Sequence, residues 1–180
     1  MTGDGIKVGG YRWRVMLWGA AALLLLAPLI AMRFTSEVNW TGSDFVAFGV
    51  MLTVLCGGVE LAVRMSRHHS YRVAAAIALL TSFLMVWMNL AVGIIGNENN
   101  PANQMFFGVL AVGLLGALIA RFRAAGLARA MVAMAIAQCL VAVVAQIGGA
   151  FVWPLTAVFA GLWLASAWLF RKAAREQAAA

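Results

Sequence analysis

The chain has 180 residues and a formal net charge of +7 at pH 7; 64% of its residues are hydrophobic and only 11% are charged. A water-soluble domain carries about 25% charged residues, so this composition excludes a fold that faces water on every side. We therefore expect an integral membrane protein whose main partner is the lipid bilayer. The basic residues lie in short clusters between apolar runs, which is typical of membrane orientation and argues against nucleic-acid binding.

Six apolar runs approach the length of about 20 residues that a helix needs to cross the hydrocarbon core of a bilayer. They are residues 15–32, 45–63, 73–95, 102–120, 127–147 and 151–170. Each run must be helical, because an open strand would leave backbone groups unpaired in lipid. The prediction is an all-α bundle of six transmembrane helices that form a single domain, residues 15–170. An N-terminal segment, 1–14, and a tail, 171–180, flank this domain.

Local signals mark three of the expected helix boundaries. Thr41-Gly-Ser-Asp44 matches a capping box immediately before the second run. Asn100-Pro101 places an N-cap residue before a proline at the first helical position of the fourth run. Gly148-Gly149 interrupts the apolar sequence between the fifth and sixth runs, so we expect these two helices to form a close hairpin.

The positions of Lys and Arg predict the orientation of the six helices. When the N-terminus is placed inside, all of the 13 Lys and Arg residues except Arg33 fall on the inner side. An excess of basic residues in cytoplasmic loops is the usual pattern in membrane proteins. Both ends of the chain, including segments 1–14 and 171–180, are therefore predicted to lie in the cytoplasm.

The second run contains Glu60, an ionisable residue within the membrane that lies three residues from the inner end of its run. The spacing of Thr53, Cys56, Gly57, Glu60 and Arg64 places these residues in one stripe along a helix. One interpretation is a carboxylate that binds a proton or cation in a polar path. The other is an ion pair between Glu60 and Arg64, one helical turn later.

The third and fifth runs carry further polar or small residues in stripes. One stripe consists of Ser82, Asn89 and Gly93 in the third run and Gly96 just after it. In the fifth run Cys139 and Gln146 share one face, with Gln138 beside them. Buried amides either line a path for a solute or join helices through hydrogen bonds worth about 0.6 kcal/mol each on average. The pattern leaves both interpretations open.

The fourth run presents a face of small residues, which consists of Gly113, Gly116, Ala117 and Ala120. Small residues allow two helix backbones to approach closely in a membrane. This face therefore predicts a helix–helix contact, either within the chain or between chains.

The sequence predicts neither an enzyme nor a bound cofactor or metal. The GxSxG, P-loop and HExxH signatures do not occur in it. His68 and His69 lie between apolar runs, where a solvated loop is the simpler interpretation. The segment 97–103 groups a carboxylate with amides but lacks the spacing of a calcium loop, and turn and capping chemistry explains its Asn and Pro residues.

Three segments carry a resemblance to known proteins: Glu60-Leu-Ala, Tyr71-Arg72 and Asn89-Leu-Ala-Val-Gly-Ile-Ile-Gly-Asn-Glu-Asn-Asn-Pro-Ala-Asn103. Through them the region from about Asp44 to Gly148 resembles a family of small bacterial membrane proteins with no assigned activity. The resemblance implies a location in the bacterial inner membrane and brings no mechanism with it.

Two hypotheses for the function follow. The first is a non-enzymatic accessory, assembly or scaffold protein that acts through helix–helix association with itself or with another membrane protein. The second is a small transporter or channel for a proton, ion or small solute. Its path would be lined by Glu60 and by the intramembrane amides Asn89, Gln138 and Gln146.

Overall fold

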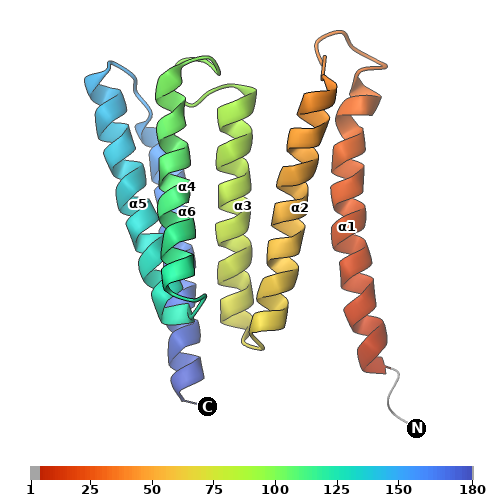
Figure 1. Cartoon of the computed structure of the whole chain (residues 1–180), viewed down its shortest axis with the longest axis vertical. Helices are drawn as coiled ribbons and strands as arrows, with labels where there is room; N and C mark the ends of the chain where they lie inside the picture. Colours follow the sequence, from red (N-terminus) through yellow and green to blue (C-terminus); the bar gives the residue numbers. More distant parts are fainter. Residues whose placement is uncertain (1–4, 180) are drawn as a thin grey trace. The chain divides into compact units, whose positions relative to one another are not determined.

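The computed structural model describes the backbone of residues 5–179 and the side chains from residue 12 onward. In that range the chain is helical without strands (Figure 1). The helices are α1 (Gly5–Ala31), α2 (Gly42–Met65), α3 (His69–Ala91), the 3-10 helix η1 (Pro101–Gln104), α4 (Met105–Ile119), α5 (Ala124–Ile147) and α6 (Trp153–Ala178).

In the described residues, six helical segments are long and apolar enough to cross a membrane. The fourth of them consists of η1 followed by α4. The predicted all-α fold with six spanning helices is therefore confirmed, whereas the side of the membrane on which each end lies stays a prediction. Part of the predicted segment 1–14 lies outside the described residues. From Gly5 onward this segment is already part of α1.

The chain forms two compact units, residues 1–61 and 62–180, with the boundary inside α2. In the first unit, α1 and α2 contact each other at several levels. The Sγ atom of Cys56 lies 4.0 Å from the carbonyl oxygen of Leu17, and the side chain of Leu25 lies against Gly49. The first unit is therefore a pair of contacting helices.

The start of α2 has the predicted capping interaction. The carboxylate of Asp44 accepts hydrogen bonds from the backbone N–H of Thr41 at 2.7 Å and from the Thr41 hydroxyl at 2.8 Å. The backbone N–H of Asp44 donates to the carbonyl of Thr41. Trp40, just before the cap, makes edge-on contacts with the rings of Phe45 and Phe48. Together these contacts determine where the chain enters α2.

The second unit contains α3 to α6, with α5 packed against α4 and α6, and α3 packed against α6. Its core includes Met85, Ala142 and Trp163, none of which exposes any surface. The short connection after α5 turns at Gly149, whose φ is +85°, and the backbone N–H of Ala150 donates to the carbonyl of Ala145. The predicted close hairpin of the last two long helices is thereby confirmed.

α3 ends at Ala91, before the apolar run 73–95 ends. The backbone N–H groups of Val92 and Gly93 both donate to the carbonyl of Met88. Gly93 and Gly96 each have φ of +72°, which side chains other than glycine rarely adopt. The prediction that these two glycines continue a stripe along the third helix is therefore wrong; both lie in the following turn.

α6 continues to Ala178, well beyond the apolar run 151–170. The tail predicted for 171–180 is therefore helical over most of its length, and Ala173 is fully buried. Glu176 accepts a hydrogen bond from the Ser70 hydroxyl at 2.8 Å and lies 3.7 Å from Nδ1 of His68. The Ala, Lys, Arg, Glu and Gln residues of this segment favour helix, and Glu176 joins it to the connection between α2 and α3.

Candidate functional site

Glu60 forms an ion pair with a residue of the neighbouring helix. Its Oε1 lies 3.2 Å from Nε of Arg14 on α1, and its side chain is 18% exposed. Cys56, one turn earlier on α2, contacts the carbonyl of Leu17 on α1. Two members of the predicted polar stripe therefore contact α1. The i, i+4 spacing of Glu60 and Arg64 gave no indication of this partner, because Arg14 is distant in sequence.

Two hydroxyl groups that belong to the predicted polar stripes are hydrogen-bonded within their own helices. The Thr53 hydroxyl donates to the carbonyl of Gly49 at 2.8 Å, and the Ser82 hydroxyl donates to that of Ala78 at 2.9 Å. Such bonds satisfy a hydroxyl locally. Ser166, which the sequence did not single out, instead donates to the carbonyl of Ala74 at 2.9 Å and so joins α6 to α3.

The amide of Asn103 organises the turn between α3 and α4. Its Oδ1 accepts hydrogen bonds from the backbone N–H groups of Ile94 at 3.0 Å and Ile95 at 2.8 Å. Its Nδ2 donates to the carbonyl of Asn97 at 2.6 Å. The Nδ2 of Asn89 donates to the backbone carbonyl of Asn103 at 3.1 Å, which attaches the turn to the end of α3. Both asparagines are buried.

Asn100 is the N-cap that the sequence predicts before the fourth span. Its Oδ1 accepts a hydrogen bond from the backbone N–H of Ala102 at 2.9 Å, and Pro101 occupies the first position of η1. The asparagines of segment 97–103 thus take part in turn and capping hydrogen bonds. This is the interpretation that the sequence favours over cation binding.

Within the described residues, the core of the second unit contains polar atoms without a hydrogen-bond partner. They are both side-chain amide atoms of Gln138, Nε1 of Trp163 and Oδ1 of Asn89. At about 1.5 Å per residue, Gln138 and Trp163 both lie roughly 14 Å from the ends where α5 and α6 are joined. Each unpaired buried polar group costs about 1–3 kcal/mol, so these atoms lower the stability of the core unless they bind a polar partner.

The other two polar residues of the fifth run are not close to this core. Cys139 and Gln146 are exposed, whereas Gln138 is buried. Cys139 and Gln146 therefore share an exposed face of α5, whereas Gln138 lies on the buried face. Only Gln138 shares the interior of the unit with Trp163.

The small-residue face of α4 contacts α5 within the chain. A Cβ atom added to Gly113 would overlap the side chain of Met134, and one added to Gly116 would lie 2.7 Å from Cβ of Ala130. Ala117 packs against the same core, and Cβ of Ala120 lies against Gly126 at the start of α5. Of the two contacts that the sequence left open, the structure contains the one within the chain.

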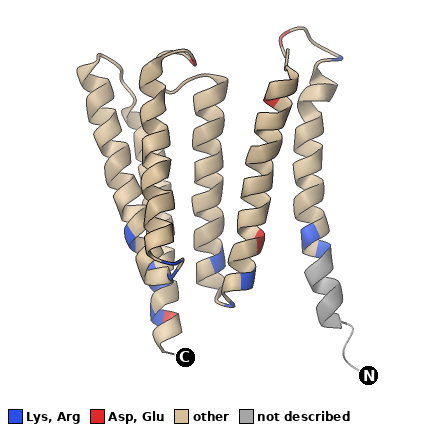
Figure 2. Cartoon of the chain, viewed as in Figure 1, with Lys and Arg blue, Asp and Glu red and all other residues tan. Residues whose placement is uncertain are grey.

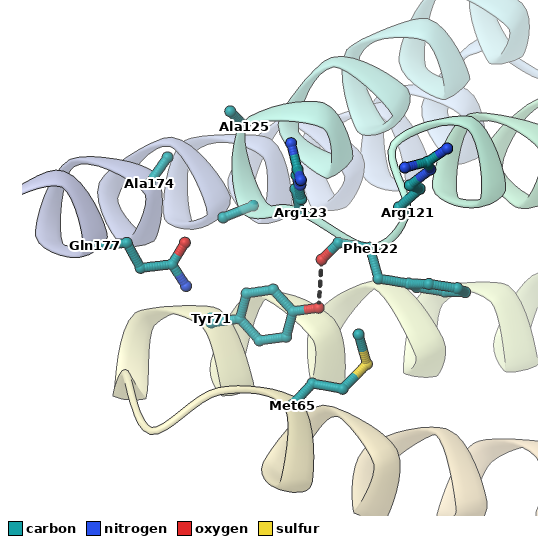
Figure 3. A pocket seen from close by; sticks show the side chains of 9 residues that line it. Met65, Tyr71, Arg121, Phe122, Arg123, Ala125, Ala174 and Gln177 are labelled. Carbon is teal, nitrogen blue, oxygen red and sulfur yellow. Dashed lines mark hydrogen bonds between the residues drawn. The ribbon is translucent and has the colours of Figure 1, made fainter.

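A pocket of about 530 Å³ lies at one end of the second unit, between the α4–α5 turn, the start of α3 and the last turns of α6 (Figure 3). The turn contains two residues in the left-handed conformation, Arg121 and Phe122, with φ of 48° and 57°. The Tyr71 hydroxyl donates to the carbonyl of Phe122 at 2.9 Å. No sequence motif predicted this pocket, because its walls come from segments that are distant in the chain.

Comparison with known proteins identifies no relative: no family model, no curated protein and no solved structure matches this chain. The resemblance to small bacterial membrane proteins therefore stays a prediction.

Proposed function

We propose that this protein is a non-enzymatic membrane protein of the bacterial inner membrane that acts by association, as an accessory, assembly or scaffold subunit with both ends in the cytoplasm. The observation that supports this best is the use of polar groups within the spans. Glu60 forms an ion pair with Arg14. Ser166 donates a hydrogen bond to the backbone of α3, and Asn89 donates one to the backbone of η1. These groups stabilise contacts within the chain.

α1 is the part of the chain that best fits contact with a partner. In the first unit, where α2 is its neighbour, 6% of the most apolar window of α1 is buried. Gly19 on α1 has open space around the position of a Cβ atom. In a membrane, glycine promotes association because it allows a second helix to approach closely.

Photo-crosslinking in intact cells tests this proposal. A photoreactive amino acid replaces Leu23 on α1 in one variant and Leu140 on α5 in a matched control, both positions being well exposed. We expect a discrete adduct from position 23 and a diffuse, lipid-dominated pattern from position 140. An adduct of twice the mass of the chain would identify the partner as a second copy. The absence of an adduct at position 23, or an equal adduct at 140, would contradict the assignment of α1.

A second candidate function, a small transporter or channel, is favoured by the unpaired atoms of Gln138 and Trp163 in the core of the second unit. Proteoliposomes loaded with a pH-sensitive dye, or with a panel of labelled solutes, test it. The comparison is between the wild-type chain and the variants Gln138→Leu and Glu60→Gln. A flux that either variant abolishes would support transport and contradict the association hypothesis. A stoichiometric partner without flux would contradict transport.

A further inference from the structure

The charged residues that line the pocket at the end of the second unit are all cationic (Figure 3). Arg121 and Arg123 contribute to its wall, and Gln177 of α6 adds an uncharged amide donor. None of the residues that line it is an aspartate or glutamate. Figure 2 shows further basic residues of this unit at the same end. The pocket is therefore suited to an anion.

The first residues of α5 add a second source of positive potential. Ala124 and Ala125 begin this 24-residue helix and line the pocket. The first N–H groups of a helix have no partner within it and carry a partial positive charge. Arg123, at the N-cap position, makes no side-chain capping bond. An anion in the pocket would complement both the two guanidinium groups and this helix end.

The α4–α5 turn holds its arginines in a defined position. The backbone N–H groups of Arg121, Phe122 and Arg123 all donate to carbonyl groups of α4 and the turn itself. The buried Tyr71 then bonds to the carbonyl of Phe122, and its ring packs edge-on against Phe170. The backbone that carries the two arginines is thus supported by α3 and α6, so binding an anion would require ordering of the exposed arginine side chains but not of the turn.

The remaining lining is apolar and lies where a spanning segment ends. Met65 is the last residue of α2, Tyr71 lies in the first turn of α3, and Ala174 follows the apolar part of α6. This level corresponds to the headgroup region of a bilayer. A basic pocket between helices at this level fits a ligand with a phosphate group attached to an apolar body.

We propose that this pocket binds the headgroup phosphate of an anionic phospholipid. Arg121 and Arg123 bind the phosphate oxygens, the N-terminus of α5 adds N–H donors, and the apolar wall contacts the glycerol and the first acyl carbons. Soluble phosphate esters share the charge of this headgroup. The apolar wall and the position at the end of the spans favour the lipid.

Native mass spectrometry of the full chain in detergent tests the proposal, with phosphatidylglycerol as the probe and phosphatidylcholine as the zwitterionic comparison. We expect one phosphatidylglycerol to remain bound under conditions that remove phosphatidylcholine. The double variant R121Q/R123Q should weaken phosphatidylglycerol binding by about tenfold or more, because two charge-assisted contacts are lost. The variant Ala125→Phe should weaken it similarly, because a large side chain at this lining position would fill part of the pocket while both arginines stay.

The matched control is R67Q/R171Q, which removes the same charge from exposed positions that do not line the pocket. It should change binding by no more than about twofold. Equal losses in both double variants would overturn the site, because they would indicate a diffuse charge effect. If the chain retained no phosphatidylglycerol but bound glycerol 3-phosphate at millimolar concentration, the lipid assignment would be overturned. Thermal unfolding of each variant establishes that the chain is folded before binding is compared.

Discussion

Arg14 of α1 and Glu60 of α2 face each other, with Nε and Oε1 3.2 Å apart. The pair joins the two helices of the first unit at the level where the sequence predicts the inner membrane interface. Because the Arg14 side chain is 41% exposed, solvent screens the attraction. The pair therefore contributes to the alignment of the helices more than to stability.

Glu60→Gln should lower the free energy of unfolding by only about 0–1 kcal/mol, the range of exposed ion pairs. Arg14→Gln should have a similar effect, and the double variant should cost less than the sum of the two. Unfolding in mixed micelles of detergent and SDS measures the free energy of unfolding of each variant in this double-mutant cycle. The control is Glu37→Gln in the exposed connection between α1 and α2, and strictly additive effects at positions 14 and 60 would contradict the pairing.

Asn103→Ala should be strongly destabilising. The change leaves the partly buried N–H group of Ile94 and the buried N–H group of Ile95 without their acceptor, which we expect to cost about 2–4 kcal/mol. Thermal unfolding and hydrogen exchange at residues 94 and 95 measure the effect. Asn99→Ala, at an exposed position of the same segment, should leave both readouts nearly unchanged. Equal effects of the two variants would show that Asn103 does not organise the turn.

Gly93→Ala should destabilise the chain by about 2–4 kcal/mol. The added methyl group would overlap the backbone of Asn97, and φ of +72° strains any residue with a Cβ atom. Gly161→Ala is the comparison in the same unit, since open space surrounds a Cβ atom at this position of α6. It should be neutral or raise stability by up to about 1 kcal/mol. A mild effect at position 93 would argue against the turn after α3.

Gln138→Leu replaces a buried amide without a partner by an apolar side chain of similar size. Stability should stay constant or rise by about 1–3 kcal/mol, because the desolvation cost of two polar atoms disappears. Gln146→Leu at the exposed end of α5 should have little effect. If stability is unchanged or raised, Gln138 has a role other than stabilising the fold, such as binding a polar molecule. A loss of more than about 1 kcal/mol would instead show that packing requires the amide.

The number and class of the helices could be predicted from the sequence because lipid permits few alternatives for an apolar run. The ends of the helices were less predictable. The apolar composition continues through Ile95, so it conceals the turn at Gly93 that ends α3. Conversely, the apolar run ends at Phe170 while α6 continues, because helix-favouring residues and the contact of Glu176 with Ser70 stabilise its last turns.

The candidate sites were predictable only where they depend on local spacing. The Thr41–Asp44 cap and the Asn100 cap are contacts between residues two or three positions apart. The Arg14–Glu60 pair connects two helices, and the basic pocket combines the α4–α5 turn with parts of α3 and α6. Such arrangements arise from tertiary packing, so no pattern along the chain could reveal them.

The hydrogen-bonded turn between α4 and α5 has a consequence for how a ligand would reach the pocket. Each backbone N–H from Ala120 to Arg123 is bonded to a nearby carbonyl, so this wall cannot widen without breaking several bonds at once. The opposite wall, at the last turns of α6, is joined to the start of α3 through the side chains of Glu176 and Ser70. We therefore expect the wall at α6 to move more easily than the α4–α5 turn when the pocket accommodates a ligand, and that movement would break the Ser70–Glu176 hydrogen bond.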